Sequence, residues 1–145
     1  MYVQLSQRLK DVATYVPKGA KLLDVGSDHA YLPIYLLEKG LITSAIAGEV
    51  VKGPYESALA NVSASGFNDK IDVRLANGLA AFEPYDAVTT ITICGMGDGL
   101  IADILDAGKD KLKDVDRLMQ PNNREDDLRI WLMKMVYYCC RSHYD

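Results

Sequence analysis

The chain has 145 residues, of which 49% are hydrophobic and 25% charged, and this suits one globular domain with a buried core. Its formal net charge of −4 disfavours a large phosphate-binding surface, because such surfaces need clustered Lys and Arg. No apolar run approaches the ~18 residues of a membrane span, and the first residues lack the apolar core of a signal peptide. We therefore expect a cytoplasmic protein with no membrane association.

The cysteines and histidines suggest neither a disulfide framework nor a metal site. Two of the three cysteines, Cys139 and Cys140, are adjacent, and the third is Cys94. This odd set is typical of ordinary intracellular thiols, and the two histidines complete no zinc-ligand spacing. We expect no bound metal.

The predicted elements alternate between helix and strand. Apolar residues from Leu5 to Val16 recur at helical spacing, and Pro17 with Gly19 ends that helix. Beyond it, short apolar or β-branched runs predict strands, and helical periodicity predicts the segments between them. Strands are expected at 20–25, 44–50, 70–75, 87–94 and 115–120, and helices at 31–38, at 55–65, near 100–105 and from Asn122 onward.

This alternation predicts an α/β fold with a Rossmann-like, doubly wound, mostly parallel sheet and helices on both faces. The run from Ala87 to Cys94 is β-branched and almost uncharged, which is typical of a central parallel strand. Right-handed crossovers bring the loops after parallel strands to one edge, where ligands bind. The candidate site residues are therefore those that follow the strands.

The first strand runs into the segment Asp24 to Ala30, which contains Gly26. A glycine lets the backbone pass close to a ligand, and the following helix offers free N–H groups. By itself, a strand–glycine–helix turn is equally consistent with a plain turn. The cofactor-binding candidates here are Asp24, Gly26, Ser27 and His29.

Two further strand ends carry groups that a nucleoside needs. Glu49, 25 residues after Asp24, can accept hydrogen bonds from both ribose hydroxyls, although a solvated charge is the alternative. Asn77 and Gly78 follow the third strand, where the amide can pair with an adenine edge or simply form a turn. Val50 completes this cofactor-binding set.

These features suit NAD as well as S-adenosylmethionine. The loop, however, lacks the glycines of G-x-G-x-x-G, and Asp28 and Ala30 stand in the later two positions. An anionic Asp28 repels a pyrophosphate but is compatible with a sulfonium cation. The charge therefore favours S-adenosylmethionine.

The fourth and fifth strand ends supply the predicted substrate side. Glycines after the fourth strand leave room for a planar base beside the reactive methyl group. Asn122 can place an amide at the same edge, or can serve as a helix N-cap. Cys94 and Gly95 join the cofactor-binding candidates, and the substrate-binding candidates are Tyr31, Met96, Gly97, Gln120, Pro121 and Asn122.

Taken in order, several short strings resemble the bacterial tRNA (adenine-22-N1)-methyltransferase family. The strings are Leu5 to Leu9, Asp24 to Pro33, Gly48 to Val50, Gly53-Pro54, Ile93 to Gly97 and Gln120 to Asn122. The resemblance runs from about Leu5 to Leu132, and Gly26 to Pro33 is its most specific part.

This resemblance implies a class I methyltransferase domain that transfers a methyl group from S-adenosylmethionine to N1 of adenine 22 in tRNA. It implies that Gly26, Ser27 and Asp28 line the cofactor site, that Glu49 holds the ribose and that Asn77 lies near the adenine. Gly95 to Gly97 would flank the target base. A helical C-terminal domain that helps to hold tRNA would follow.

Two departures from the family qualify this expectation. Asp98 stands where a further glycine is expected, and residues 133–145 resemble nothing in the family. We therefore assign 1–132 to the methyltransferase domain and no domain to 133–145. We expect a C-terminally truncated chain whose sheet lacks its last antiparallel strands.

The expected chemistry asks little of a catalytic side chain. N1 of neutral adenine carries a lone pair, so the enzyme must align it with the methyl group, exclude water and accept a base that is unpaired. Asp28 is the catalytic candidate because a carboxylate stabilises the charge that develops on the base. It can instead only organise the loop, and His29 can be structural. The competing functions are a cofactor-binding module without turnover and a small-molecule methyltransferase.

Overall fold

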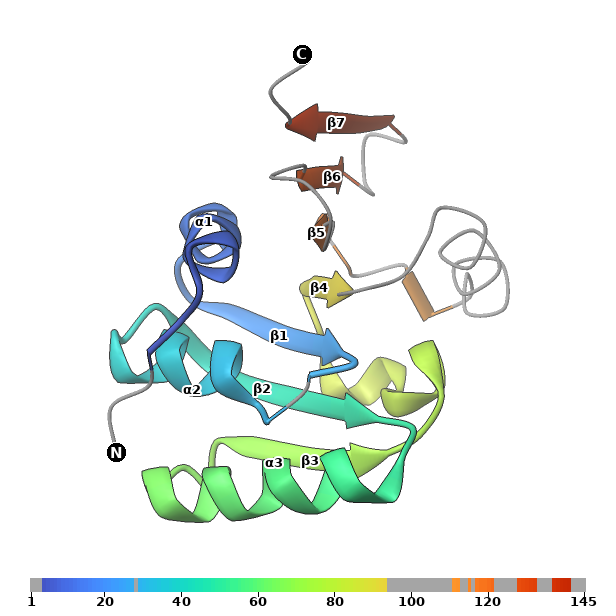
Figure 1. Ribbon diagram of the computed structural model, residues 1–145. Coiled ribbons are helices and arrows are strands. Elements are labelled where there is room, and N and C mark those ends of the chain that lie inside the picture. The colour runs from blue at the N-terminus through green and yellow to red at the C-terminus, as the bar shows by residue number, and fades with distance from the viewer. Residues whose placement is uncertain are drawn as a thin grey trace.

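The computed structural model of the chain describes residues 4–27, 29–93, 111–112, 115, 117–121, 128–132 and 137–141. The described strands form one sheet in the order β3-β2-β1-β4-β5-β6-β7 (Figure 1). The pairs from β3 to β5 are parallel, and β6 and β7 are antiparallel to their neighbours. The strands are β1 Ala20–Val25, β2 Ile42–Glu49, β3 Ile71–Leu75, β4 Thr90–Ile93, β5 Arg117–Pro121, β6 Leu128–Leu132 and β7 Tyr137–Arg141.

The parallel part of the sheet is wound in two directions from β1. The chain moves outward through β2 and β3, and then returns to place β4 and β5 on the other side of β1. The register aligns Val25 with Gly48 and with Ile93, and Glu49 with Leu75. This topology confirms the predicted doubly wound, mostly parallel α/β class and brings the carboxyl ends of the five parallel strands to one edge.

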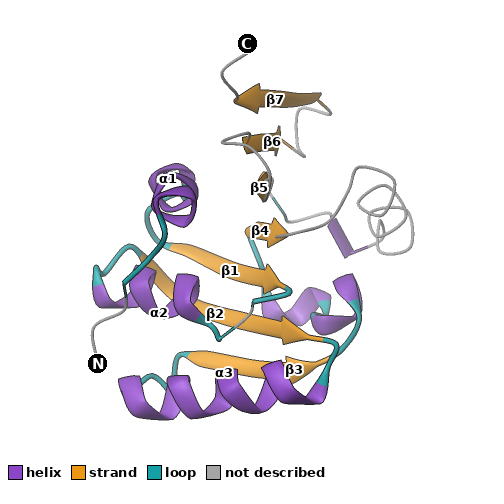
Figure 2. Ribbon diagram, viewed as in Figure 1, coloured by secondary structure: helices purple, strands orange, loops and turns teal. Residues whose placement is uncertain are grey.

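Three helices cover one face of this sheet, and Figure 2 shows them alongside β1 to β3. They are α1 (Gln7–Tyr15), α2 (Tyr31–Glu38) and α3 (Lys52–Ser65), close to the predicted ranges. Local signals set their ends: Ser6 accepts a hydrogen bond from the Leu9 amide at 3.3 Å, and α3 stops at Gly66 with φ +80°. Their core partners from the strands include Leu22, Ala47 and Val73.

The opposite face carries a second core cluster. Between β3 and β4 the chain makes two short 3-10 turns, η1 (Gly78–Ala81) and η2 (Pro84–Asp86). Fully buried Phe82, between these turns, packs in one cluster with Ile46 and Ile91 of the strands. The helix predicted near 100–105 lies outside the described residues.

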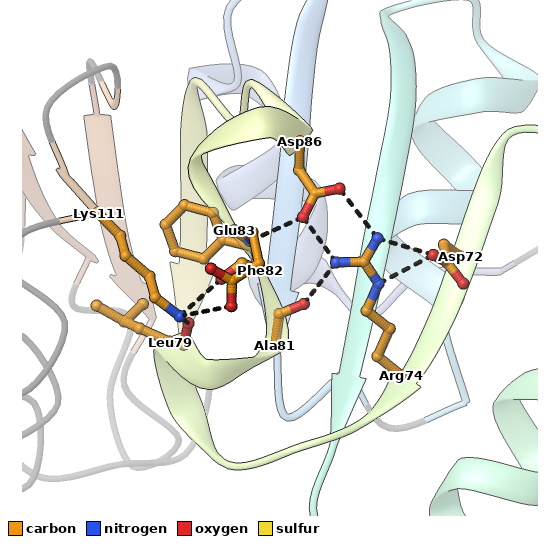
Figure 3. A network of polar contacts seen from close by, with 8 residues as sticks. All are labelled: Asp72, Arg74, Leu79, Ala81, Phe82, Glu83, Asp86 and Lys111. Carbon is orange, nitrogen blue, oxygen red and sulfur yellow. Dashed lines mark hydrogen bonds and ion pairs between the residues drawn. The ribbon is translucent and has the colours of Figure 1, made fainter.

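Arg74 fixes these turns to the sheet, as Figure 3 shows. Its guanidinium donates to both carboxylate oxygens of Asp86, at 2.7 and 3.0 Å, and to the Ala81 carbonyl at 2.9 Å. Beyond η1, Lys111 donates to the carbonyls of Leu79 and Phe82 at 3.1 and 2.8 Å. Charged side chains therefore supply hydrogen-bond donors to the carbonyl groups at the ends of these short turns.

The last two strands differ from the prediction. The helix expected from Asn122 onward is wrong for Leu128–Leu132, which form β6, antiparallel to β5. A segment this short fits the period of a strand as well as that of a helix, and pairing with β5 satisfies its backbone as a strand. Tyr137–Arg141 then form β7, so antiparallel strands lie at the edge where we expected none. The domain boundary after 132 stays a prediction.

Candidate functional site

The candidate site lies at the carboxyl edge of β1, β2 and β3, where the predicted polar residues follow the strands. Figure 1 shows these parallel strands ending on the same side of the molecule. The loops after β1 and β3 are each tied to β2. The Gly26 amide donates to the Gly48 carbonyl at 2.9 Å, and the Ala76 amide donates to the Glu49 carbonyl at 2.8 Å.

Asp24 is a buried carboxylate with a hydrogen bond on each oxygen. The residue is 1% exposed, and its carboxylate accepts from Thr92 Oγ1 at 2.6 Å and from Ser27 Oγ at 2.8 Å. Burial raises the pKa of Asp24 to about 6, the two hydrogen bonds oppose that rise, and the charge of Glu49 adds to it. Asp24 thus links β1, β4 and the loop after β1.

Glu49 is a second buried acid at this edge. It is the last residue of β2 and is 5% exposed, so it is not the solvated strand-end charge that was the alternative. Val50, which follows it, is 57% exposed. The chain thus places a shielded carboxylate beside an exposed apolar side chain.

The loop after β1 turns sharply at Gly26, whose φ is +68°, a conformation that favours glycine. Ser27 is buried, and its amide also donates to the Gly48 carbonyl, at 3.2 Å. Gly48 itself is in a confined place, because a Cβ there would lie 3.1 Å from the Cβ of Ala81. Glycine at 48 therefore lets η1 pack close to β2.

His29 and Tyr31 lie together where α2 begins. Their rings stack with centroids 5.1 Å apart. The His29 Nδ1 lies 2.6 Å from Ser57 Oγ, and Asn61 Nδ2 donates to the His29 carbonyl at 2.9 Å. The predicted residue His29 is therefore held by α3.

Asn77 and Gly78 begin the turn after β3. Asn77 is exposed, and its carbonyl accepts from the Ala80 amide at 3.0 Å. Gly78 is buried with φ +57°. The exposed amide suits contact with a ligand, and Gly78 is the residue that forms the turn.

The remaining predicted residues fall in parts of the chain with less structural description. Gln120 and Pro121 belong to β5 and lie opposite Arg129 and Leu128 of β6. Outside the described residues are Asp28, Cys94, Gly95, Met96, Gly97 and Asn122.

Sequence reasoning did not single out Thr92, Ser57 or Asn61. Thr92 was treated only as part of an apolar strand. Because Thr90 and Thr92 alternate with Ile91 and Ile93, their two hydroxyl groups share one face of that strand, which is a signal for a polar contact. Ser57 and Asn61 are four residues apart and so share a helix face, but nothing local indicates that His29 is their partner.

The chemistry of these groups fits a nucleoside that carries a positive charge. Two buried acids on adjacent strands disfavour a phosphate, and Glu49 can accept hydrogen bonds from neighbouring hydroxyls. Within the described residues, no group of three or more His, Cys, Asp or Glu could hold a metal ion, and no helix is long and apolar enough to cross a membrane. A cavity of about 270 Å³ lies beside Arg74 and Lys70 and contains none of the predicted site residues.

Comparison with known proteins identifies the family to which this chain is similar. The family model described as tRNA (adenine(22)-N(1))-methyltransferase matches residues 22–141. The chain is 48% identical, over 93% of its length, to a Bacillus subtilis tRNA (adenine(22)-N(1))-methyltransferase and covers 57% of it. The matched region includes β6 and most of the segment for which we found no family resemblance.

Two solved structures share the fold. A Streptococcus agalactiae protein of the NADB-Rossmann superfamily has a TM-score of 0.81 and 65% identity, covering 87% of this chain and 57% of its own. A Streptococcus pneumoniae protein, solved in complex with S-adenosyl-L-methionine, has a TM-score of 0.80 and 64% identity, covering 84% and 57%. The chain thus spans a little over half the length of these relatives. On its sequence match and fold, this chain belongs to the tRNA (adenine(22)-N(1))-methyltransferase family.

Proposed function

We propose that the chain carries the cofactor-binding part of an S-adenosylmethionine-dependent enzyme that methylates N1 of adenine 22 in tRNA. The observation that carries the proposal is the pair of buried carboxylates, Asp24 and Glu49, at the carboxyl edge of a family-matched sheet. The Streptococcus pneumoniae relative was solved with S-adenosyl-L-methionine, which supports this ligand. A tRNA substrate also supports a cytoplasmic location.

In this proposal each part of the edge has a separate task. Glu49 accepts hydrogen bonds from the ribose hydroxyls, and Asn77 lies beside the adenine ring. The backbone at Gly26 and Ser27 faces the amino-acid end of the cofactor, while Asp24 holds the Ser27 hydroxyl in place. Bound S-adenosylmethionine supplies a methyl group made electrophilic by a sulfonium.

The target base is its own nucleophile, through the lone pair of N1. The chain must therefore hold that atom in line with the methyl group and keep water away. Because N1 lies on the Watson–Crick edge, the adenine must be unpaired when it enters. Asp28 stays a sequence-based prediction for the carboxylate that stabilises charge on the base.

A methylation assay tests the reaction and separates it from its competitors. We expect this chain to transfer methyl groups from S-adenosylmethionine to unmodified tRNA only slowly, and not at all to tRNA with guanine at position 22. Methylation of both tRNAs contradicts the assigned position. Cofactor binding without transfer identifies a binding module, and transfer only to small molecules identifies the other competing function.

Substitution of Glu49 tests the cofactor site separately. Glu49→Gln should weaken S-adenosylhomocysteine binding by about 1.5–3 kcal/mol, the range for hydrogen bonds to a charged group. Calorimetry measures this, with Glu56→Gln on the exposed side of α3 as the control. If both variants bind as the wild type does, Glu49 does not hold the ribose.

A further inference from the structure

The turn between β1 and α2 has a backbone conformation that non-glycine residues rarely adopt. His29 has φ +67° and Ala30 has φ +60°, both in the left-handed region. Ala30 is fully buried, so the turn cannot change without disturbing the core. Two consecutive residues of this kind persist only where the surrounding structure holds them.

The contacts that hold this turn come from α3, about thirty residues further along the chain. Asn61 Nδ2 donates to the His29 carbonyl at 2.9 Å, which fixes the peptide between the two left-handed residues. Ser57 Oγ lies 2.6 Å from the His29 Nδ1, one helical turn away on the same face of α3. We call His29, Ser57 and Asn61 the loop clamp.

The position of α3 links the loop clamp to Glu49 and to the loop after β1. The helix begins at Lys52, three residues after Glu49, and it contacts the turn that follows Gly26 and Ser27. The helix α3 therefore connects Glu49, the proposed ribose-binding residue, to the loop after β1. The side-chain hydrogen bonds of Ser57 and Asn61 go to His29 and not to α3 itself, so we expect α3 to form without them.

We propose that Ser57 and Asn61 are positioning residues of the methyltransferase, which hold the loop after β1 in its binding conformation before the cofactor arrives. This proposal takes its ligand, S-adenosylmethionine, from the proposed function. The hold of Ser57 and Asn61 on the loop after β1 does not depend on that function. A clamp that pre-organises the site lowers the cost of binding, so its loss should raise KM for S-adenosylmethionine more than it lowers kcat.

The first test uses the cofactor-free full chain and hydrogen exchange of the backbone amides of residues 26, 27, 29 and 30. Asn61→Ala should increase exchange at least tenfold, whereas Ser63→Ala should leave it unchanged. Ser63 is the matched control because it is an exposed residue of α3 whose hydroxyl contacts Asn68 instead of the loop. Equal exchange in Asn61→Ala and the wild type overturns the clamp.

The second test measures binding of S-adenosylhomocysteine by calorimetry, together with the unfolding temperature. Asn61→Ala and Ser57→Ala should raise Kd at least tenfold, and Ser57→Thr, which keeps the hydroxyl, should bind as the wild type does. Ala30→Gly removes the steric cost of the left-handed conformation, so adding it to Asn61→Ala should recover part of the affinity.

The outcomes separate the two proposals. If the wild type binds no S-adenosylhomocysteine, the proposed function fails, and the clamp is still judged by exchange. If the wild type binds and the folded clamp variants bind equally well, the clamp is wrong. A loss of affinity that follows the fall in unfolding temperature, without recovery by Ala30→Gly, also overturns it.

Discussion

Asp24 shows how one buried residue couples the site to pH. The folded chain binds the Asp24 proton up to about pH 6, because burial raises its pKa from an ordinary value of 3.8. The stability that this proton contributes is complete below pH 3.8 and is lost as the pH rises through 6. Above that range the carboxylate is charged in both states and remains buried when folded.

Asp24→Asn should remove this dependence, because Asn keeps the shape of the protonated acid without titrating. Relative to the wild type, the variant should gain about 2 kcal/mol of unfolding free energy between about pH 4.5 and 7. Urea unfolding at several pH values measures the difference. Curves for the two proteins that stay parallel over this range would show that Asp24 does not titrate there.

At the level of elements, the link between β3 and β4 depends on charged side chains. Hydrogen bonding from Arg74 lowers the pKa of Asp86, so this pair contributes stability that is lost as the pH falls through that lowered pKa. The two side chains are 27% and 12% exposed, which shields them partly from solvent.

A double-mutant cycle of Arg74→Met and Asp86→Asn should therefore give a coupling of about 1–3 kcal/mol in unfolding free energy. The control cycle uses Lys52 and Glu56, an exposed pair on α3 at 3.9 Å, for which about 0.3–0.5 kcal/mol is expected. Similar coupling in the two cycles would mean that the bidentate contact adds nothing.

The elements that sequence predicted best are those whose own residues determine them. From Gln7 to Ile93, apolar periodicity and the stops at Pro17 and Gly66 predicted α1 to α3 and β1 to β4 to within a few residues, but not the short turns η1 and η2. Leu128–Leu132 were misassigned because a five-residue apolar segment fits both periods, and only pairing with β5 decides.

The candidate site was predicted in part for a related reason. Glu49 and Gly26 occupy strand ends that the alternation of elements reveals. Thr92 acts on Asp24, and Asn61 acts on His29, across 68 and 32 residues of sequence, and no local pattern encodes such contacts. The conformation of the loop after β1 is likewise set by its tertiary partners.

For the molecule as a whole, the net charge of −4 bears on the proposed binding of tRNA. An acidic chain releases few counterions on binding, so its affinity for tRNA should be low and should vary little with salt. We expect at least tenfold weaker tRNA binding than that of the full-length Bacillus subtilis relative, of which this chain covers 57%. Filter binding over a salt series measures both affinity and slope, and equal values would refute this expectation.

The hydrogen bond from Thr92 to Asp24 also limits how this sequence can change. It joins β1 to β4, between which the direction of winding reverses, and both residues are at most 1% exposed. Replacing either one alone with an apolar residue leaves the other as a buried polar group without this partner, which costs free energy. A change at position 92 is therefore tolerated best when position 24 changes with it, so we expect substitutions at the two positions to occur together.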